Sequence, residues 1–214
     1  MKFRLRDGTY DEYILHEQPT YFDNIKPKKT DIWLDAGANI GCFSVLLAPK
    51  VKEVIAYEPE LDNFRILKGH LTLNRLTNVK TIRKAIVGNL DVVREFHIWK
   101  GTNKGLHSFF KFMPDEGLQT VTVACDNIND TIKKYKINKI KMDVEGAEQE
   151  ILEGMTEWDK IEEMIFEYHY SVLKKRPLTF KSGLVKMLRK HFKEISISWG
   201  PKGTQLVYAH KGIL

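Results

Sequence analysis

The stretch D-I-W-L-D-A-G-A-N-I-G-C-F-S-V-L-L, residues 31–47, decides how this chain folds. Its first apolar run, residues 32–34, is short and is followed by an acid and a glycine, which predicts a buried strand ending in a tight turn. Gly37 and Gly41 allow the backbone to turn sharply and to approach a ligand without a Cβ atom in the way. Residues 42–48 are apolar enough for a helix packed on a sheet. The stretch therefore predicts the strand, turn and helix of a nucleoside-binding unit.

An acid at the end of the next apolar run indicates which nucleoside is bound. Residues 54–57 predict a second strand, and Glu58 follows it, where a carboxylate accepts hydrogen bonds from both ribose hydroxyls. The glycine pattern is D-x-G-x-x-x-G rather than the G-x-G-x-x-G of dinucleotide sites, and Asp35 within it would repel a pyrophosphate. S-adenosylmethionine has no phosphate and carries a sulfonium cation. The pattern therefore favours this methyl donor over NAD and over a purely structural glycine turn.

The remainder of the chain alternates predicted strands and helices. Strands are predicted at residues 79–87, 137–142, 161–166, 194–199 and 204–209, and helices at residues 60–76, 126–135, 148–155 and 184–192. A tight turn at residues 200–203 joins the last two strands, which predicts an antiparallel pair at one edge of the sheet. The predicted fold class is α/β, with a mostly parallel, doubly wound sheet and an antiparallel C-terminal edge strand.

The length of the chain predicts a single domain over residues 1–214. It is long enough for a sizeable core, and no linker or repeat interrupts it. Residues 1–30 are expected to form an N-terminal cap over the sheet. Residues 89–120 are expected to form a β-rich insertion, with strands at 92–99 and 119–125 around a mobile loop.

The composition argues against several classes of protein. The net charge is +6, but the basic residues are scattered, and their densest cluster, residues 174–193, is typical of an exposed helix face. No stretch approaches the roughly 20 apolar residues that span a bilayer, and the charged N-terminus is unlike a signal peptide. Cys42 and Cys125 lack disulfide or metal-ligand spacing, which fits a reducing compartment. We expect a cytoplasmic chain without a membrane span, also compatible with a module of a larger protein.

A second motif, K-M-D-V-E-G-A-E at residues 141–148, places two acids at the end of a predicted strand. Glu148 is explained by the preference of acids for the first turn of a helix. Asp143 is not, because an acid at the tip of a buried parallel strand is costly unless a ligand or a cation uses it. Doubly wound sheets bind ligands at the carboxyl ends of their strands, so the acids there are expected to converge on one crevice. These acids are Asp35, Glu58, Asp143 and Glu167.

Five segments carry a resemblance to a known family. They are L-D-A-G-A-N-I-G, A-Y-E-P-E with Asn63 following, K-A-I-V-G, I-K-M-D-V-E-G-A-E-Q-E-I-L and I-F-E-Y-H. Together they resemble the FkbM family of S-adenosylmethionine-dependent methyltransferases, from about residue 30 to about residue 170. The resemblance implies a Rossmann-like class I methyltransferase fold with a seven-stranded sheet. It also implies O-methylation, often of a sugar hydroxyl on a glycan, a lipid or an antibiotic, without naming the acceptor.

The resemblance also implies roles for individual residues. The methionine part of the cofactor would lie among Asp35, Gly37, Asn39 and Gly41. Glu58 would bind the ribose, and Ala85 and Ile86 would lie near the adenine. The catalytic candidates match the family's acidic strand ends beside the transferring methyl: Asp143, Glu145, Glu167 and His169. No family motif matches the N-terminal cap or the insertion, where acceptor selection is expected to reside.

Methyl transfer is an in-line displacement, so the protein has to hold the acceptor oxygen about 3 Å from the methyl group and remove the hydroxyl proton. Asp143 is the first candidate for the base, followed by His169 and Glu145. A histidine in this position is as often a structural hydrogen-bonding residue. A divalent ion held by the carboxylates is an alternative, but a cationic cofactor explains them equally well, so no metal is expected.

Two other functions compete with that of a sugar O-methyltransferase. An RNA-directed methyltransferase or RNA-binding protein would use the basic surface, but few aromatic residues for base stacking lie near residues 174–176. A methyltransferase-like scaffold would bind the cofactor without methylating any acceptor. The resemblance implies a sugar or glycan as the partner, and nucleic acid is not expected.

Overall fold

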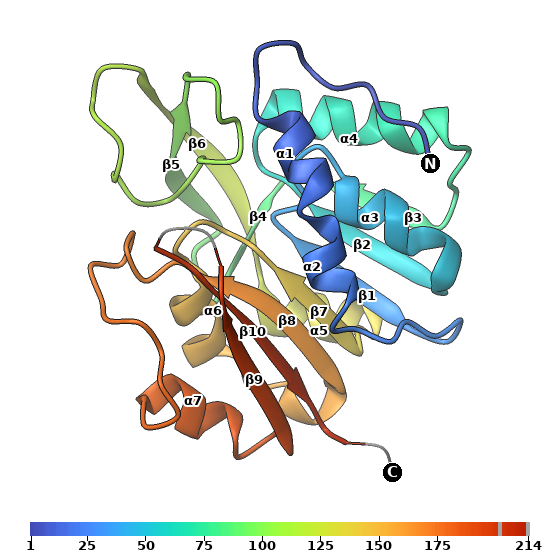
Figure 1. The fold of residues 1–214 in the computed structure, drawn as a ribbon, viewed down its shortest axis with the longest axis vertical. Helices are drawn as coiled ribbons and strands as arrows, with labels where there is room; N and C mark the ends of the chain where they lie inside the picture. Colours follow the sequence, from blue (N-terminus) through green and yellow to red (C-terminus); the bar gives the residue numbers. More distant parts are fainter. Residues whose placement is uncertain (201–202, 213–214) are drawn as a thin grey trace.

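A sheet of seven strands organises the computed structural model, which describes residues 1–200 and 203–212 (Figure 1). The strands are β1 (Ile32–Ala36), β2 (Glu53–Tyr57), β3 (Val79–Ile82), β7 (Lys139–Met142), β8 (Glu163–Tyr168), β9 (Glu194–Trp199) and β10 (Gln205–His210). Their order is β3-β2-β1-β7-β8-β10-β9. The first five are parallel, whereas β10 pairs antiparallel with both β8 and β9. The predicted α/β class and the antiparallel pair at one edge are confirmed.

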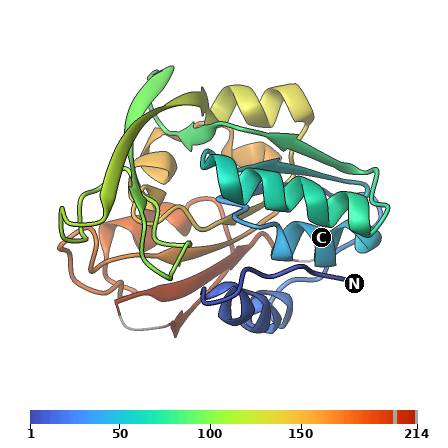
Figure 2. The same ribbon diagram turned by 90° about the horizontal axis from the view of Figure 1, so that it is seen from above.

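Helices cover both faces of this sheet, because its central strands are apolar on both sides. Every residue of β1 is buried, which is typical of a strand with a layer on each face. Trp33 packs with α2 (Gln18–Phe22) and α3 (Cys42–Leu47), whereas Leu34 packs on the opposite face. Figure 2 shows α5 (Ile128–Tyr135) and the N-terminal helices on opposite sides of the strands.

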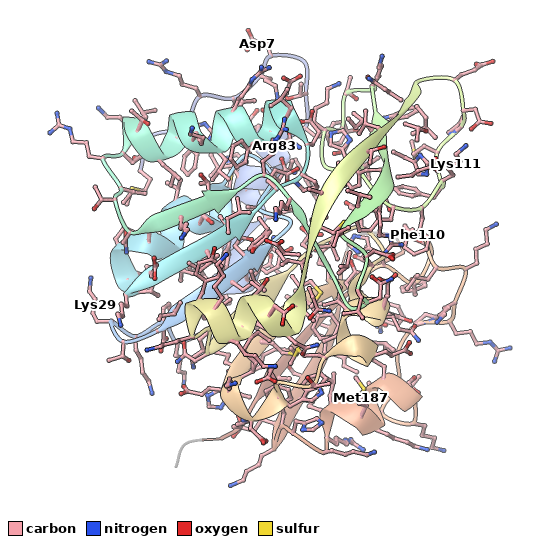
Figure 3. All side chains as sticks on the ribbon, turned by 180° about the vertical axis from the view of Figure 1, so that it is seen from behind. Asp7, Lys29, Arg83, Phe110, Lys111 and Met187 are labelled. Atoms are coloured by element: carbon pink, nitrogen blue, oxygen red, sulfur yellow. The ribbon has the colours of Figure 1, made fainter. Side chains whose placement is uncertain are left out.

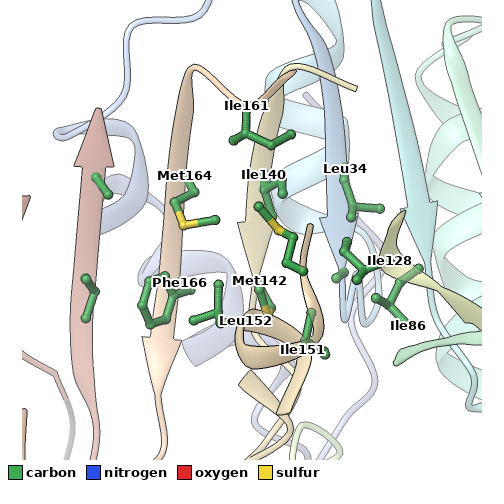
Figure 4. Close-up of a cluster of buried hydrophobic side chains, with 14 of the residues drawn as sticks. Leu34, Ile86, Ile128, Ile140, Met142, Ile151, Leu152, Ile161, Met164 and Phe166 are labelled. Atoms are coloured by element: carbon green, nitrogen blue, oxygen red, sulfur yellow. The ribbon is translucent and has the colours of Figure 1, made fainter. Parts of the chain in front are cut away.

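The larger core lies beneath α5, α6 (Glu148–Gly154) and α7 (Gly183–Leu188) (Figure 4). On the other face, α1 (Asp11–His16) precedes α2, and α4 (Leu61–Leu73) packs beside α3. Two short 3-10 helices, Ala48–Lys50 and Trp158–Lys160, complete the element order. None of the helices in residues 1–200 and 203–212 is long and apolar enough to cross a lipid bilayer.

A second, three-stranded sheet stands beside the first and is ordered β4-β6-β5. It consists of β4 (Ala85–Val87), β5 (Val93–Trp99) and β6 (Leu118–Asn127). Residues 79–87 were predicted as one strand, which is wrong, because β3 ends at Ile82 and β4 pairs with β6 instead. Figure 3 places Phe110 and Lys111 on the loop that joins β5 to β6.

The remaining differences from the expected elements lie at their ends. Residues 126 and 127 were expected in the helix but belong to β6. The Asn127 side chain caps α5 by accepting a hydrogen bond from Asn129 N, so the helix begins at Ile128. The last helix ends at Leu188 rather than at residue 192. In the expected turn at residues 200–203, Pro201 and Lys202 lie outside the described residues.

Candidate active site

A cavity of about 430 Å³ opens at the carboxyl ends of β1, β2, β7 and β8. Helix α1, strand β4 and the β5–β6 loop also contribute to its wall. Nine of the eleven predicted site residues line it: Gly37, Asn39, Glu58, Ala85, Ile86, Asp143, Glu145, Glu167 and His169. Of the four strand-end acids predicted to converge on one crevice, Glu58, Asp143 and Glu167 line this cavity, whereas Asp35 does not.

The turn after β1 brings the backbone of the glycine motif against the end of β7. Gly37 has φ +76°, and a Cβ atom there would lie 1.8 Å from the carbonyl oxygen of Asp143. Only glycine fits this position, because both the left-handed conformation and the space exclude a side chain. The same turn is held from β2, where the Tyr57 carbonyl accepts hydrogen bonds from Gly37 N and Ala38 N at 3.1 and 2.9 Å.

Glu58 is buried at the end of β2 and keeps its carboxylate fixed by two backbone groups. Oε2 accepts a hydrogen bond from Asn39 N and Oε1 accepts one from Glu60 N, both at 2.8 Å. Burial raises its pKa to about 8, despite these two hydrogen bonds. Each oxygen still has acceptor capacity for a ribose hydroxyl.

Asn63, in the first turn of α4, was named only as part of a motif and has a specific place in the cavity wall. Its Nδ2 donates to the carbonyl of Lys104 at 3.0 Å, which ties the β5–β6 loop to α4. Its Oδ1 is buried and has no hydrogen-bond partner within residues 1–200 and 203–212. A buried amide oxygen beside Glu58 is suited to accept a hydrogen bond from a bound nucleoside.

Asp35 and Gly41 were predicted to contact the methionine part of the cofactor, but both lie behind the cavity wall. Asp35 is fully buried; its Oδ2 accepts a hydrogen bond from Ser44 Oγ at 2.6 Å, and its Oδ1 lies 3.3 Å from Lys141 Nζ. Gly41 has φ +86° and packs against Leu67, where it begins α3. Both residues shape the turn rather than reach the cavity.

The four catalytic candidates meet at one point of the cavity. His169 Nε2 lies 3.3 Å from Glu145 Oε2, 3.5 Å from Glu167 Oε2 and 3.9 Å from Asp143 Oδ1. Glu145 reaches this point because it has φ +52° in the turn between β7 and α6. Ligand atoms of Asp143, Glu145 and His169 lie within 4.8 Å of one another, so these three residues could hold a metal ion. The expectation of no metal stays a prediction.

Glu148 orients His169 from behind. This carboxylate is fully buried, and its Oε1 lies 2.9 Å from His169 Nδ1 while accepting a hydrogen bond from Gly146 N at 3.0 Å. The preference of acids for the first turn of a helix explains why residue 148 is a glutamate, but it does not explain this contact with His169. No pattern in the sequence pairs residue 148 with residue 169, so the fold was needed to find it.

Burial and crowding of charge shift the pKa values of these groups. Burial, together with the neighbouring Asp143 carboxylate, raises the pKa values of Glu145 and Glu167 to about 8. Burial alone would lower the pKa of His169, but the Glu145 and Glu148 carboxylates raise it well above its ordinary value. The surrounding carboxylates therefore favour the protonated form of His169.

Two further groups from the N-terminal helices approach this cluster. Glu17, which follows α1, lines the cavity, and burial together with the Asp143 charge raises its pKa to about 8. The Tyr21 hydroxyl of α2 donates to Asp143 Oδ2 at 3.4 Å. The polar, mixed sequence of residues 1–30 does not single out either residue.

Comparison with known proteins identifies the family. The model described as "Methyltransferase FkbM domain" matches residues 35–191. The chain belongs to the FkbM methyltransferase family. The methyl donor of this FkbM protein is S-adenosylmethionine, as its sequence pattern predicts. The buried Glu58 carboxylate, the unpartnered Asn63 Oδ1 and the narrow Gly37 turn fit that cofactor.

Two fungal proteins are similar in sequence. "Methyltransferase sdnD" of Sordaria araneosa is 28% identical over 168 residues, which cover 63% of this chain and 64% of that protein. "Methyltransferase 1" of Beauveria bassiana is 25% identical over 157 residues, which cover 63% of each chain. The FkbM chain thus spans less than two thirds of these relatives. An rRNA methylase from Streptococcus thermophilus has a TM-score of 0.53 at 10% identity over 92% of this chain and 94% of its own, which shows the fold alone.

At about pH 9, where the Glu58 carboxylate is ionised, replacing Glu58 with alanine should weaken binding of S-adenosylhomocysteine about ten- to a hundredfold, because charge-assisted hydrogen bonds to the ribose are lost. Isothermal titration calorimetry measures this change. Glu53→Ala, at the opposite end of β2, is the matched control and should bind as the wild type does. Unchanged affinity in a folded Glu58→Ala variant would contradict the ribose assignment.

The preference for S-adenosylmethionine over S-adenosylhomocysteine should increase several-fold as pH rises from about 7 to about 9. Glu145 and Glu167, with pKa values raised from 4.5 to about 8, lose their protons in this range and attract the sulfonium, which only the methyl donor carries. The same raised pKa values mean that the unliganded protein loses stability as pH rises through about 8.

Calorimetric titrations with both ligands, and thermal unfolding of the unliganded protein over the same pH series, measure these two effects. Glu167→Gln should flatten the pH dependence of the ratio. A ratio that stays constant in the wild type would show that these carboxylates do not face the transferring methyl.

Proposed function

We propose that this FkbM protein is an S-adenosylmethionine-dependent O-methyltransferase that acts on a sugar hydroxyl of a glycan or glycoconjugate. The observation that supports this proposal is the joining of two sites in one cavity. Glu58 and Asn63 line its donor side, and a group of carboxylates around His169 lines the side where a hydroxyl would be deprotonated. O-methylation requires both within one enclosed space.

The bound cofactor supplies an electrophilic methyl group on a sulfonium. The chain has to place the acceptor hydroxyl in line with the departing sulfur and take its proton as the C–O bond forms. A carboxylate of the cavity would keep this proton once the methyl group has been transferred. The chain's role is therefore positioning and acceptance of one proton.

Asp143 is the side chain best suited to accept that proton. Its carboxylate lines the cavity with a quarter of its surface exposed, and its hydrogen bond from Tyr21 is long. Lys141 Nζ lies 3.8 Å from its Oδ2, and His169 Nε2 lies 3.9 Å from its Oδ1. His169 is less suited, because its pKa is raised well above the ordinary value, which favours its protonated form.

Aromatic and polar groups on the acceptor side fit a sugar ring. His107 and Phe109 line the cavity, and so does Tyr13 of α1. Trp99, at the end of β5, packs against Gly101 and Gly117 instead. An aromatic face can cover the apolar side of a sugar while carboxylates bind its hydroxyls. A phosphate would be repelled by the same carboxylates, which disfavours an RNA acceptor.

We further propose that the N-terminal cap (residues 1–30) and the insertion (residues 89–120) select the acceptor within one domain covering residues 1–214. Glu17 and His107 bring these segments to the cavity. Both cysteines are buried free thiols, which is consistent with action in a reducing compartment such as the cytoplasm.

Incubation of the wild type with S-adenosylmethionine and a broad acceptor panel should give a product heavier by one methyl group only in the glycan fractions. Mass spectrometry identifies it, and the matching deoxy sugar should fail as an acceptor, because the site's buried polar groups would be left unpaired. Methylation of RNA, of protein or of a phenol with all glycans untouched would contradict the sugar assignment. Tight cofactor binding without any methylated acceptor would favour a scaffold.

Asp143→Asn should lower turnover about a hundredfold or more, because the amide keeps the size of the side chain but cannot accept the proton. Initial rates on the glycan found in the panel measure this loss, and affinity for S-adenosylhomocysteine should change much less. Asp62→Asn, exposed on α4, is the control. Near-normal turnover of Asp143→Asn together with an inactive Glu145→Gln would move the base to Glu145. Activity that is lost with a chelator and restored by magnesium would overturn the expectation of no metal.

A further inference from the structure

Lys141 is a buried cation in the centre of the site, although the donor and acceptor roles described above do not require it. It lies in β7, is 4% exposed and lines the cavity. Lysine is rarely buried this deeply unless its charge is paired. Burial lowers its pKa, but Asp35 and Asp143 outweigh that effect and raise it above the ordinary value. The side chain is therefore a permanent positive charge.

The ammonium group joins the two halves of the site. Nζ donates to the carbonyl oxygen of Gly37 at 3.0 Å and lies 3.3 Å from Asp35 Oδ1 and 3.8 Å from Asp143 Oδ2. Gly37 belongs to the turn that approaches the cofactor, and Asp143 is the proposed base. One side chain thus contacts both the donor turn and the group that would deprotonate the acceptor.

The strand register explains why this lysine can reach all three partners. Asp35 of β1 pairs directly with Lys141 of β7, so both side chains emerge on the same face of the parallel sheet. The rings of Tyr21 and Phe43 lie 5.6 and 5.9 Å from Nζ and close the space around it. The ammonium group is thereby confined to the gap between the donor turn and Asp143.

Lys139 provides a comparison within the same strand. It points to the same face two residues earlier, is 2% exposed, and lies 3.0 Å from Glu163 Oε2. It does not line the cavity in the described residues and contacts neither Gly37 nor Asp143. Pairing of a buried lysine is therefore a general feature of β7, whereas contact with the donor turn belongs to Lys141.

We propose that Lys141 is a positioning residue that fixes the spacing between the cofactor-binding turn at Gly37 and the carboxylate of Asp143. The role of the Gly37 contact depends only on the cofactor binding beside this turn, whereas the role of the Asp143 contact rests on the proposed function. A misplacement of about 1 Å between reacting groups can cost on the order of a hundredfold in rate, so one fixed spacing has catalytic value.

The test compares Lys141→Met, Lys141→Arg and Lys139→Met by calorimetric titration with S-adenosylhomocysteine, at a temperature where all variants are folded. Lys141→Met should bind about tenfold more weakly, since it loses a charge-assisted hydrogen bond to the turn. Lys141→Arg should retain more affinity, because it keeps a cation in reach. Lys139→Met should unfold at a lower temperature than the wild type while keeping wild-type affinity.

With the acceptor identified in the panel, Lys141→Met should lower kcat more than it raises KM for the acceptor. Wild-type affinity in Lys141→Met, an equal loss in Lys139→Met, or no recovery in Lys141→Arg would overturn the proposal. If Lys141→Met does not fold, the double variant Asp35→Asn/Lys141→Met removes both charges of the buried pair. This variant should fold and should still bind S-adenosylhomocysteine weakly. If the variants show the expected affinities but no glycan is methylated, the role of the Gly37 contact is supported and the proposed function is refuted.

Discussion

The contact between the backbone of Gly37 and the carbonyl of Asp143 is the constraint on which the site depends. No side chain separates the two segments, because a Cβ atom on Gly37 would lie 1.8 Å from that carbonyl oxygen. Asp143 N also donates to the Ala36 carbonyl at 3.0 Å, so the ends of β1 and β7 are joined as a continuation of the sheet. The glycine turn and Asp143, the proposed base, are therefore neighbours through backbone geometry, which a flexible loop could not provide as rigidly.

This closeness concentrates charge that the fold has to balance. Asp143, Glu145, Glu148 and Glu167 surround a single histidine, and Lys141 supplies the second cation. Burial of so many carboxylates destabilises their ionised forms, which explains the pKa values near 8 of Glu145 and Glu167. The unliganded site thus holds more carboxylates than cations. In the proposed arrangement, the positive charge of the methyl donor would offset this excess. Binding of that donor and stability of the cluster are two consequences of one charge distribution.

The fold and most of the cavity could be predicted because both depend on local patterns. Short apolar runs that end in glycines and acids mark strand ends, and parallel sheets gather those ends. The unforeseen contacts join distant positions: Lys141 and Gly37 are 104 residues apart, and His169 and Glu148 are 21 apart. Strand register and the packing of helices on the sheet decide such pairs. The single strand predicted over residues 79–87 failed for a related reason, because nothing local shows that β4 leaves β3 to pair with β6.

The N-terminal helices bring to the cavity residues that the matched family region, 35–191, does not include. Glu17 lies among the carboxylates, and Tyr10 N donates to the Thr102 carbonyl at 3.2 Å, which joins the N-terminal segment to the β5–β6 loop. Asn63 holds the same loop from α4 through Lys104. The N-terminal segment and the β5–β6 loop therefore meet over the strand ends that line the cavity. On the proposed assignment, strand ends form the donor side of the cavity and these two segments form the acceptor side, so changes in the segments would alter the choice of acceptor without changing the donor side.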